Sequence, residues 1–153
     1  MNRGALGLLL SLASVACIGP LSENVEHEYP NAKVAKATDH GWIPAILSED
    51  AASIREVHNI DSNRTWGCFT TRELGTVRTA LSTLGATRTA GPIHAGPHEI
   101  FRDFSWWPES MSSSTIEAME FREAPPFPAA RQGFLIRVGI DGATGTVCFH
   151  RSL

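Results

Sequence analysis

Long hydrophobic runs are absent from this chain of 153 residues. Its most apolar stretch, Ala5 to Val15, has 11 residues, whereas a transmembrane helix needs roughly 20. A basic excess is absent too, because 13 lysines and arginines stand against 16 aspartates and glutamates, for a net charge of −3. The sequence therefore offers no membrane-spanning helix and no basic patch of the kind that binds nucleic acid.

Strong catalytic and metal-binding patterns are missing as well. No glycine-rich phosphate loop follows an expected strand, and no two carboxylates stand at the spacing of an acid–base pair. His94 and His98 have the spacing of metal ligands on a helix, but Gly96 and Pro97 between them disfavour a helix. We therefore expect an exposed loop over residues 91–97 and no bound metal or cofactor.

A thiol nucleophile is the remaining catalytic pattern. Cys68, His58 and Asp61 belong to one expected hairpin and could act as nucleophile, base and orienting group. Cysteines of exported proteins are more often in disulfides, and Asp61 is typical of a turn. We therefore interpret these three residues as structural and do not expect an enzyme.

The first residues indicate export. Arg3 precedes the apolar run, and small residues lead up to Cys17, which is typical of a signal peptide over residues 1–16. Ordinary signal peptidase and the bacterial lipoprotein pathway would both cut between Ala16 and Cys17. The first route leaves a periplasmic or secreted protein, whereas the second leaves Cys17 lipidated and anchored in a bacterial membrane.

The three cysteines favour the lipoprotein route. An unpaired thiol invites cross-linking in an oxidising compartment, and acylation of Cys17 would leave one pair, Cys68 and Cys148. Both lie on expected strands, so they could meet if those strands are neighbours. We therefore predict a Cys68–Cys148 disulfide.

Domain organisation follows from composition. Residues 17–39 scatter their apolar side chains without helical or strand period, so we expect an extended tether. Residues 40–153 are enough for one domain. Ser48, followed by acidic residues, predicts a short helix that ends near Ile54.

Periodicity predicts an α+β fold for this domain. Strands are expected over 55–60 and 65–70, over 116–122, and as a second hairpin over 134–149. The repeat of Leu74, Val77, Leu81 and Leu84 predicts an amphipathic helix over 71–84. The expected architecture is an antiparallel sheet of two hairpins, with four or five strands, packed on this main helix, in addition to the short N-terminal helix.

The four tryptophans could fill a core or form a binding platform. We expect most of them to be buried, with Trp42 partly exposed because it stands beside Gly41 at the start of the domain. Trp42, His94 and His98 are the side chains that we expect at a binding surface.

Several short motifs together resemble a family of small exported proteins and lipoproteins of bacteria to which no activity is attached. The resemblance implies export and a compact α+β fold. The motifs are Gly41–Pro44, Glu56–Asn63, Trp66–Phe69, Trp106–Pro108 and the hairpin Phe134–His150.

These observations predict a non-catalytic envelope module, membrane-tethered or secreted, that binds an envelope protein or a cell-wall component. One alternative is a secreted inhibitor or immunity-type protein that binds through the loop Gly85–Pro97. Another is a small envelope enzyme, which would need a pocket of perturbed ionisable groups around His58, Asp61 or His150.

Overall fold

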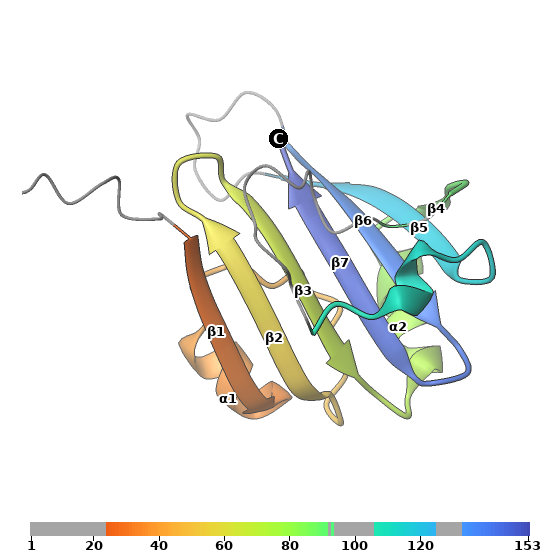
Figure 1. Ribbon diagram of the computed structural model, residues 1–153, viewed down its shortest axis with the longest axis horizontal. Helices are drawn as coiled ribbons and strands as arrows, with labels where there is room; N and C mark the ends of the chain where they lie inside the picture. The colour runs from red at the N-terminus through yellow and green to blue at the C-terminus, as the bar shows by residue number, and fades with distance from the viewer. Residues whose placement is uncertain (1–23, 92, 94–105, 125–132) are drawn as a thin grey trace, which may run out of the picture.

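A single antiparallel sheet of seven strands dominates the structure (Figure 1), a computed structural model that describes residues 24–91, 93, 106–124 and 133–153. The strand order is β1-β2-β3-β7-β6-β5-β4. Consecutive strands therefore pair with each other within β1–β3 and within β4–β7. The pairing of β3 with β7 joins these two groups into one sheet. The strands are β1 (Asn24–Asn31), β2 (Ala52–Asn59), β3 (Arg64–Thr70), β4 (Thr87–Arg88), β5 (Glu117–Glu123), β6 (Phe134–Asp141) and β7 (Thr146–Ser152).

The expected α+β architecture with one main helix is wrong. Among the described residues the α-helices are short, α1 (Ala32–Thr38) and α2 (Leu74–Thr83), with one 3-10 helix, η1 (Glu109–Ser112). The helix expected over 71–84 corresponds to α2, and both hairpins are present. The sheet is larger than expected because β1 and β4 extend its two edges, so strands and not a helix carry most of the fold.

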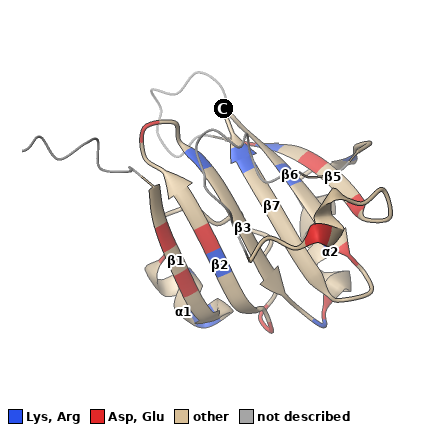
Figure 2. Cartoon of the chain, viewed as in Figure 1, with Lys and Arg blue, Asp and Glu red and all other residues tan. Residues whose placement is uncertain are grey.

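The tether expected over residues 17–39 is wrong from residue 24 onward, where the chain enters the sheet. β1 pairs with β2 along its length, and α1 follows directly, with Asn31 Oδ1 accepting a 3.0 Å hydrogen bond from Val34 N. Tyr29 and Ala35 are buried. The acidic side chains of β1 mark an edge strand (Figure 2), and charged residues on an edge discourage pairing with other chains.

The helix expected from Ser48 to Ile54 is also absent. Ser48 Oγ lies 2.8 Å from both Asp50 Oδ1 and Thr71 Oγ1 in a shared hydrogen-bond network, and Arg72 N donates to Asp50 Oδ2 at 2.8 Å. Ser and Asp often bond to the backbone and to one another in place of a helix. Here they tie the entry of β2 to the start of α2.

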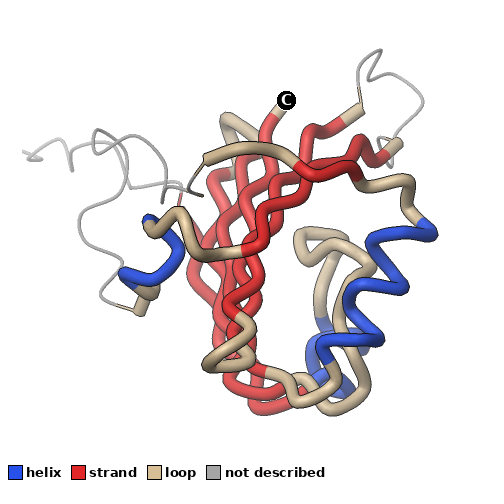
Figure 3. The backbone as a smooth tube through the Cα atoms, turned by 90° about the vertical axis from the view of Figure 1, so that its right-hand side faces the viewer, coloured by secondary structure: helices blue, strands red, loops and turns tan. Residues whose placement is uncertain are grey.

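The sheet has a covering layer on each face (Figure 3). α1, α2 and the segment between α1 and β2 cover one face, and η1 with its neighbours covers the other. Val77 and Leu81 of α2 are fully buried, whereas Leu74 and Leu84 are partly buried against the same core. The other buried side chains of this core are Tyr29, Ala32, Ala35, Ile46, Ala51, Ile54, Phe69, Phe121, Ile136, Val138, Ile140, Val147 and Phe149.

The opposite face carries the predicted disulfide. Cys68 on β3 and Cys148 on β7 are direct cross-strand neighbours, with Cα atoms 4.0 Å apart, and their sulfurs are bonded. Met111 of η1 is buried against them, and Trp106 and Trp107 pack on the same cluster. The expectation that most tryptophans are buried holds only for Trp66, because Trp106 and Trp107 are partly buried against the disulfide cluster.

Candidate functional site

His27, Glu56 and His58 form a compact group, the histidine–glutamate cluster, on the α1-covered face of β1 and β2. His27 lies directly across from Glu56 in the β1–β2 register. His58 follows Glu56 by two residues, so strand alternation places both on one face. Two neighbouring strands therefore bring two imidazoles and one carboxyl group together.

The carboxyl group of Glu56 lies between the two imidazoles. His58 Nδ1 is 3.1 Å from both Glu56 Oε1 and Glu56 Oε2. His27 Nε2 is 4.0 Å from Glu56 Oε1. The three potential ligand atoms lie within 4.8 Å of one another.

Trp42 covers the cluster from the segment between α1 and β2. The Asp39 carboxylate accepts hydrogen bonds from the backbone N–H groups of Gly41 (2.9 Å), Trp42 (3.1 Å) and Ile43 (3.3 Å). This turn places the indole of Trp42 on the His58 ring, with centroids 4.0 Å apart and planes inclined by 6°. Trp42 remains half-buried, as its position in the sequence predicted.

Arg151 holds the same turn from β7. Its guanidinium is buried and lies 3.8 Å from the centre of the Phe134 ring, and its Nη1 donates a hydrogen bond to the Gly41 carbonyl. The Trp42 turn is thus fixed by Asp39 from one side and by the last strand of the sheet from the other.

Glu56 is fully buried, and an aromatic ring closes one side of its site. Its exposed fraction is 0 %. Gly67 lies opposite Glu56 on β3, and a methyl group there would come within 2.7 Å of Phe149 Cε1, so the phenyl ring fills the space above Gly67. A glycine at this position lets an aromatic side chain of β7 close the site beside the carboxyl group.

Burial perturbs both buried members of the cluster. Desolvation, with a smaller contribution from the Asp39 charge, raises the pKa of Glu56 to about 8. Desolvation first, and then the neighbouring His27, lowers the pKa of His58. Both shifts favour the uncharged forms, so a protonated carboxyl group beside a neutral imidazole is the favoured state of the metal-free pair.

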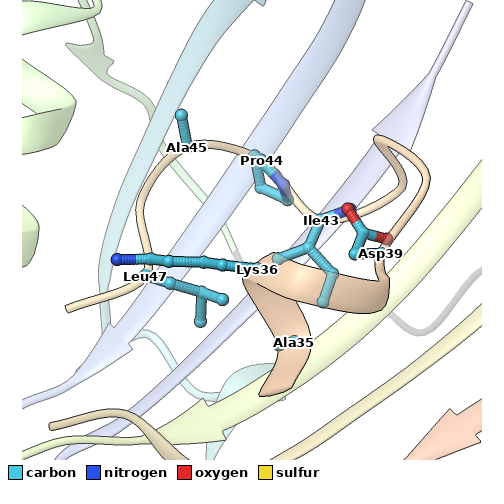
Figure 4. A pocket seen from close by; sticks show the side chains of 7 residues that line it. All are labelled: Ala35, Lys36, Asp39, Ile43, Pro44, Ala45 and Leu47. Carbon is cyan, nitrogen blue, oxygen red and sulfur yellow. The ribbon is translucent and has the colours of Figure 1, made fainter. Parts of the chain in front are cut away.

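A small cleft lies next to the Trp42 turn (Figure 4). It has a volume of about 240 Å³, at or below the lower end of the range for small-molecule sites, about 300–1,000 Å³. Asp39 lines this cleft and also caps the Trp42 turn, whereas the three cluster residues do not line it. The lining residues are Ala35, Lys36, Asp39, Ile43, Pro44, Ala45 and Leu47.

The other candidate residues from the sequence do not assemble into a catalytic group. Cys68 is in the disulfide, and it lies on the opposite face of the sheet from His58. Asp61 is exposed in the β2–β3 turn. The thiol nucleophile is therefore excluded by geometry. Cys17, His94 and His98 lie outside the described residues.

The pairing of His27 with Glu56 across β1 and β2 was not predicted from the sequence. The alternation of Glu56 and His58 along an expected strand was visible. The matching alternation of Val25, His27 and Tyr29 with acidic residues is the signal that could have revealed β1 as a strand, but its polar character suggested a tether.

His150 is a second histidine with a perturbed pKa, and it lies on β7, on the opposite face of the sheet from the cluster. Its ring stacks on Trp66 with centroids 4.8 Å apart. Burial, and then the charges of Arg64 and Arg137, lower the pKa of His150 to about 4. Because the unfolded chain binds this proton near pH 6.5 and the folded chain does not, stability should fall as pH drops from about 6.5 to about 4.

We expect His150→Phe to remove this loss, which for a shift of this size amounts to at most roughly 3–4 kcal/mol once the pH is below both pKa values. Phenylalanine keeps a ring for Trp66 but cannot be protonated. Urea denaturation at a series of pH values between 4 and 7, on wild type and variant, measures the difference in slope. Parallel stability curves for the two proteins would contradict this assignment.

The hydropathy of the helices and three comparisons with known proteins complete the description of the site. Among the described residues, no helix has both the length and the apolar character required to cross a membrane. No curated protein and no solved structure matches the chain. A family model described as the YbbD head domain, from a bacterial family, matches residues 23–70, which span β1, α1, β2 and β3 and contain the whole histidine–glutamate cluster together with Trp42.

Proposed function

We propose that this protein is an exported, non-catalytic module of the bacterial cell envelope that is held in a membrane by lipid on Cys17 and binds an envelope protein or a cell-wall component. The observation that carries this proposal is the buried disulfide between Cys68 and Cys148. Disulfides of this kind persist in oxidising compartments outside the cytosol. The match of residues 23–70 to a bacterial family supports the bacterial part of the proposal.

The non-catalytic part of the proposal is supported by how the perturbed groups are arranged. Glu56 and His58 contact each other and are covered by Trp42. The cleft beside them is small and does not include them. An enzyme would expose such groups to a substrate in a pocket, so the burial of Glu56 and His58 under Trp42 favours a non-catalytic role.

The attachment would be short. Counting the proposed lipidated residue Cys17 itself, seven residues, 17–23, precede Asn24, the first residue of β1. A fully extended chain covers at most about 3.5 Å per residue, so this segment reaches roughly 25 Å. β1 and the cluster would therefore face partners close to the membrane surface.

Metabolic labelling tests the anchor. The full chain is expressed in a bacterial host with an alkyne-tagged fatty acid, in parallel with Cys17→Ser. We expect label and membrane fractionation for wild type, and loss of both for the variant. A wild-type chain that carries no label would contradict the lipid anchor.

Thiol trapping tests export separately from the anchor. Cells expressing Cys17→Ser are treated with a thiol-alkylating reagent, and Cys68 and Cys148 should be protected as a disulfide. Free thiols at both positions in the cell would overturn export itself.

Cross-linking of the anchored protein to the envelope, followed by purification, identifies the bound component. A cell-wall fragment or a protein retained by wild type supports the binding module. An envelope enzyme whose activity the protein abolishes would instead make it an inhibitor.

A further inference from the structure

We propose that the histidine–glutamate cluster of His27, Glu56 and His58 is a binding site for a divalent transition metal of the zinc type. The three side chains come from two neighbouring strands, and their ligand atoms lie within 4.8 Å of one another. The inference goes beyond the proposed envelope function and does not depend on where the protein resides.

The donor set matches this class of metal. Two imidazole nitrogens and one carboxylate oxygen form the ligand set of several zinc sites that keep an open coordination position. Ca²⁺ and Mg²⁺ instead take oxygen ligands almost exclusively. Imidazole donors favour zinc, copper, nickel and iron.

The distances require only a small adjustment. Ligand atoms in a tetrahedral zinc site, with bonds of about 2.0–2.2 Å, lie roughly 3.3–3.6 Å apart. His58 Nδ1 and Glu56 Oε1 are 3.1 Å apart, and His27 Nε2 and Glu56 Oε1 are 4.0 Å apart. Only His27 must therefore move inward for all three to reach one ion.

His27 is the more exposed of the two imidazole ligands, and its ring stacks beside those of Tyr29 and His58, with centroids 5.8 Å and 5.6 Å away. The His27 side chain is 46 % exposed and lies on the edge strand β1. The His58 side chain is buried under the Trp42 indole, which contacts the face of the imidazole and leaves the ring nitrogens in its plane for a metal. An exposed ligand on an edge strand can therefore adjust toward two buried ligands that already contact each other.

A metal would also compensate a buried acid. Buried charges in proteins are paired or coordinate metals. Metal binding requires Glu56 as the carboxylate, and in the described part of the chain no lysine or arginine lies within ion-pair distance of it, since its neighbours are the imidazoles of His27 and His58. Three protein ligands leave at least one coordination position, which water or a donor atom of a bound partner would occupy.

Titration with ZnCl₂ tests the proposal on the full chain after chelator treatment and dialysis. Isothermal titration calorimetry should give one bound Zn²⁺ per chain. His27→Ala should weaken the affinity at least about tenfold, since even residues that only orient ligands cost about 10–100-fold. Because His27 is exposed at an edge, this variant should keep the wild-type circular dichroism spectrum.

Two matched controls make the result specific. His40→Ala removes an exposed histidine outside the cluster, and the double variant His94→Ala with His98→Ala removes the alternative histidine pair. Both should bind Zn²⁺ as wild type does. Co²⁺ offers a second readout, because a four-coordinate nitrogen and oxygen site gives visible absorption that Glu56→Gln should diminish or shift.

Three outcomes would overturn the site. They are no Zn²⁺ binding by wild type, binding that His27→Ala leaves unchanged, and binding lost only in the His94 and His98 double variant. None of these outcomes affects export or lipidation, so a failure here is distinguishable from a failure of the proposed function.

Discussion

Replacing Cys68 and Cys148 together by alanine is expected to lower the free energy of unfolding by about 4 kcal/mol. The disulfide joins residues separated by 80 positions, so it restricts a large part of the unfolded chain. In the chain-entropy model the stabilisation grows with the logarithm of loop length. The bond also ties β3 to β7, the contact that joins the two hairpins into one sheet.

Urea denaturation of the oxidised proteins measures this difference. Cys17→Ala is the matched control, because it removes the third cysteine without removing the disulfide, and it should stay within about 0.5 kcal/mol of wild type. Wild type treated with a reductant should lose a similar amount to the double variant. A double variant as stable as oxidised wild type would show that the bridge contributes nothing.

The predictable parts of the fold are those with strong local periodicity. The alternation in β6 and β7 and the helical spacing of Val77 and Leu81 are visible in the sequence because each element buries one face against the core. The turn between β2 and β3 was marked by residues that bond locally, and Ser62 N does donate to Asn59 Oδ1 at 2.8 Å.

The edges of the sheet were not predictable in the same way. β1 exposes one side and one edge to solvent, so its sequence resembles a polar linker, and only its pairing with β2 distinguishes it. β4 has two residues, too few for any periodic signal. The fold class was misjudged for this reason: the core helix was located, but the strands that enlarge the sheet were not.

Less of the candidate site than of the fold could be predicted from the sequence, because the site is built by contacts between residues that are far apart in the chain. Glu56 and His58 share a face by strand alternation alone, which the sequence shows. His27 reaches them only through the β1–β2 register. Trp42 reaches His58 only because Asp39 and Arg151 hold its turn, and Arg151 is 110 residues away from its contact at Gly41. Long-range geometry of this kind has no local sequence signature.

Leu81→Ala is expected to destabilise the protein by roughly 2–5 kcal/mol, the range for buried leucines. Leu81 has an exposed fraction of 0 % and lies in the core between α2 and the sheet. Truncation removes apolar contacts and leaves a cavity beside α2. This helix has 10 residues, of which Val77 and Leu81 are buried, so it can fill the cavity only by shifting on the sheet.

Ser82→Ala is the matched control for Leu81→Ala, because Ser82 is the next residue of α2 and is exposed. An exposed substitution of this kind should change the free energy of unfolding by no more than about 0.5 kcal/mol. Both variants introduce alanine, which is the best helix former, so neither lowers the helix propensity of α2. Urea denaturation of the two variants therefore isolates the loss of core packing in Leu81→Ala. A Leu81→Ala variant that unfolds with the same free energy as Ser82→Ala would mean that α2 does not stabilise the sheet, and that the strands hold this face of the core together without it.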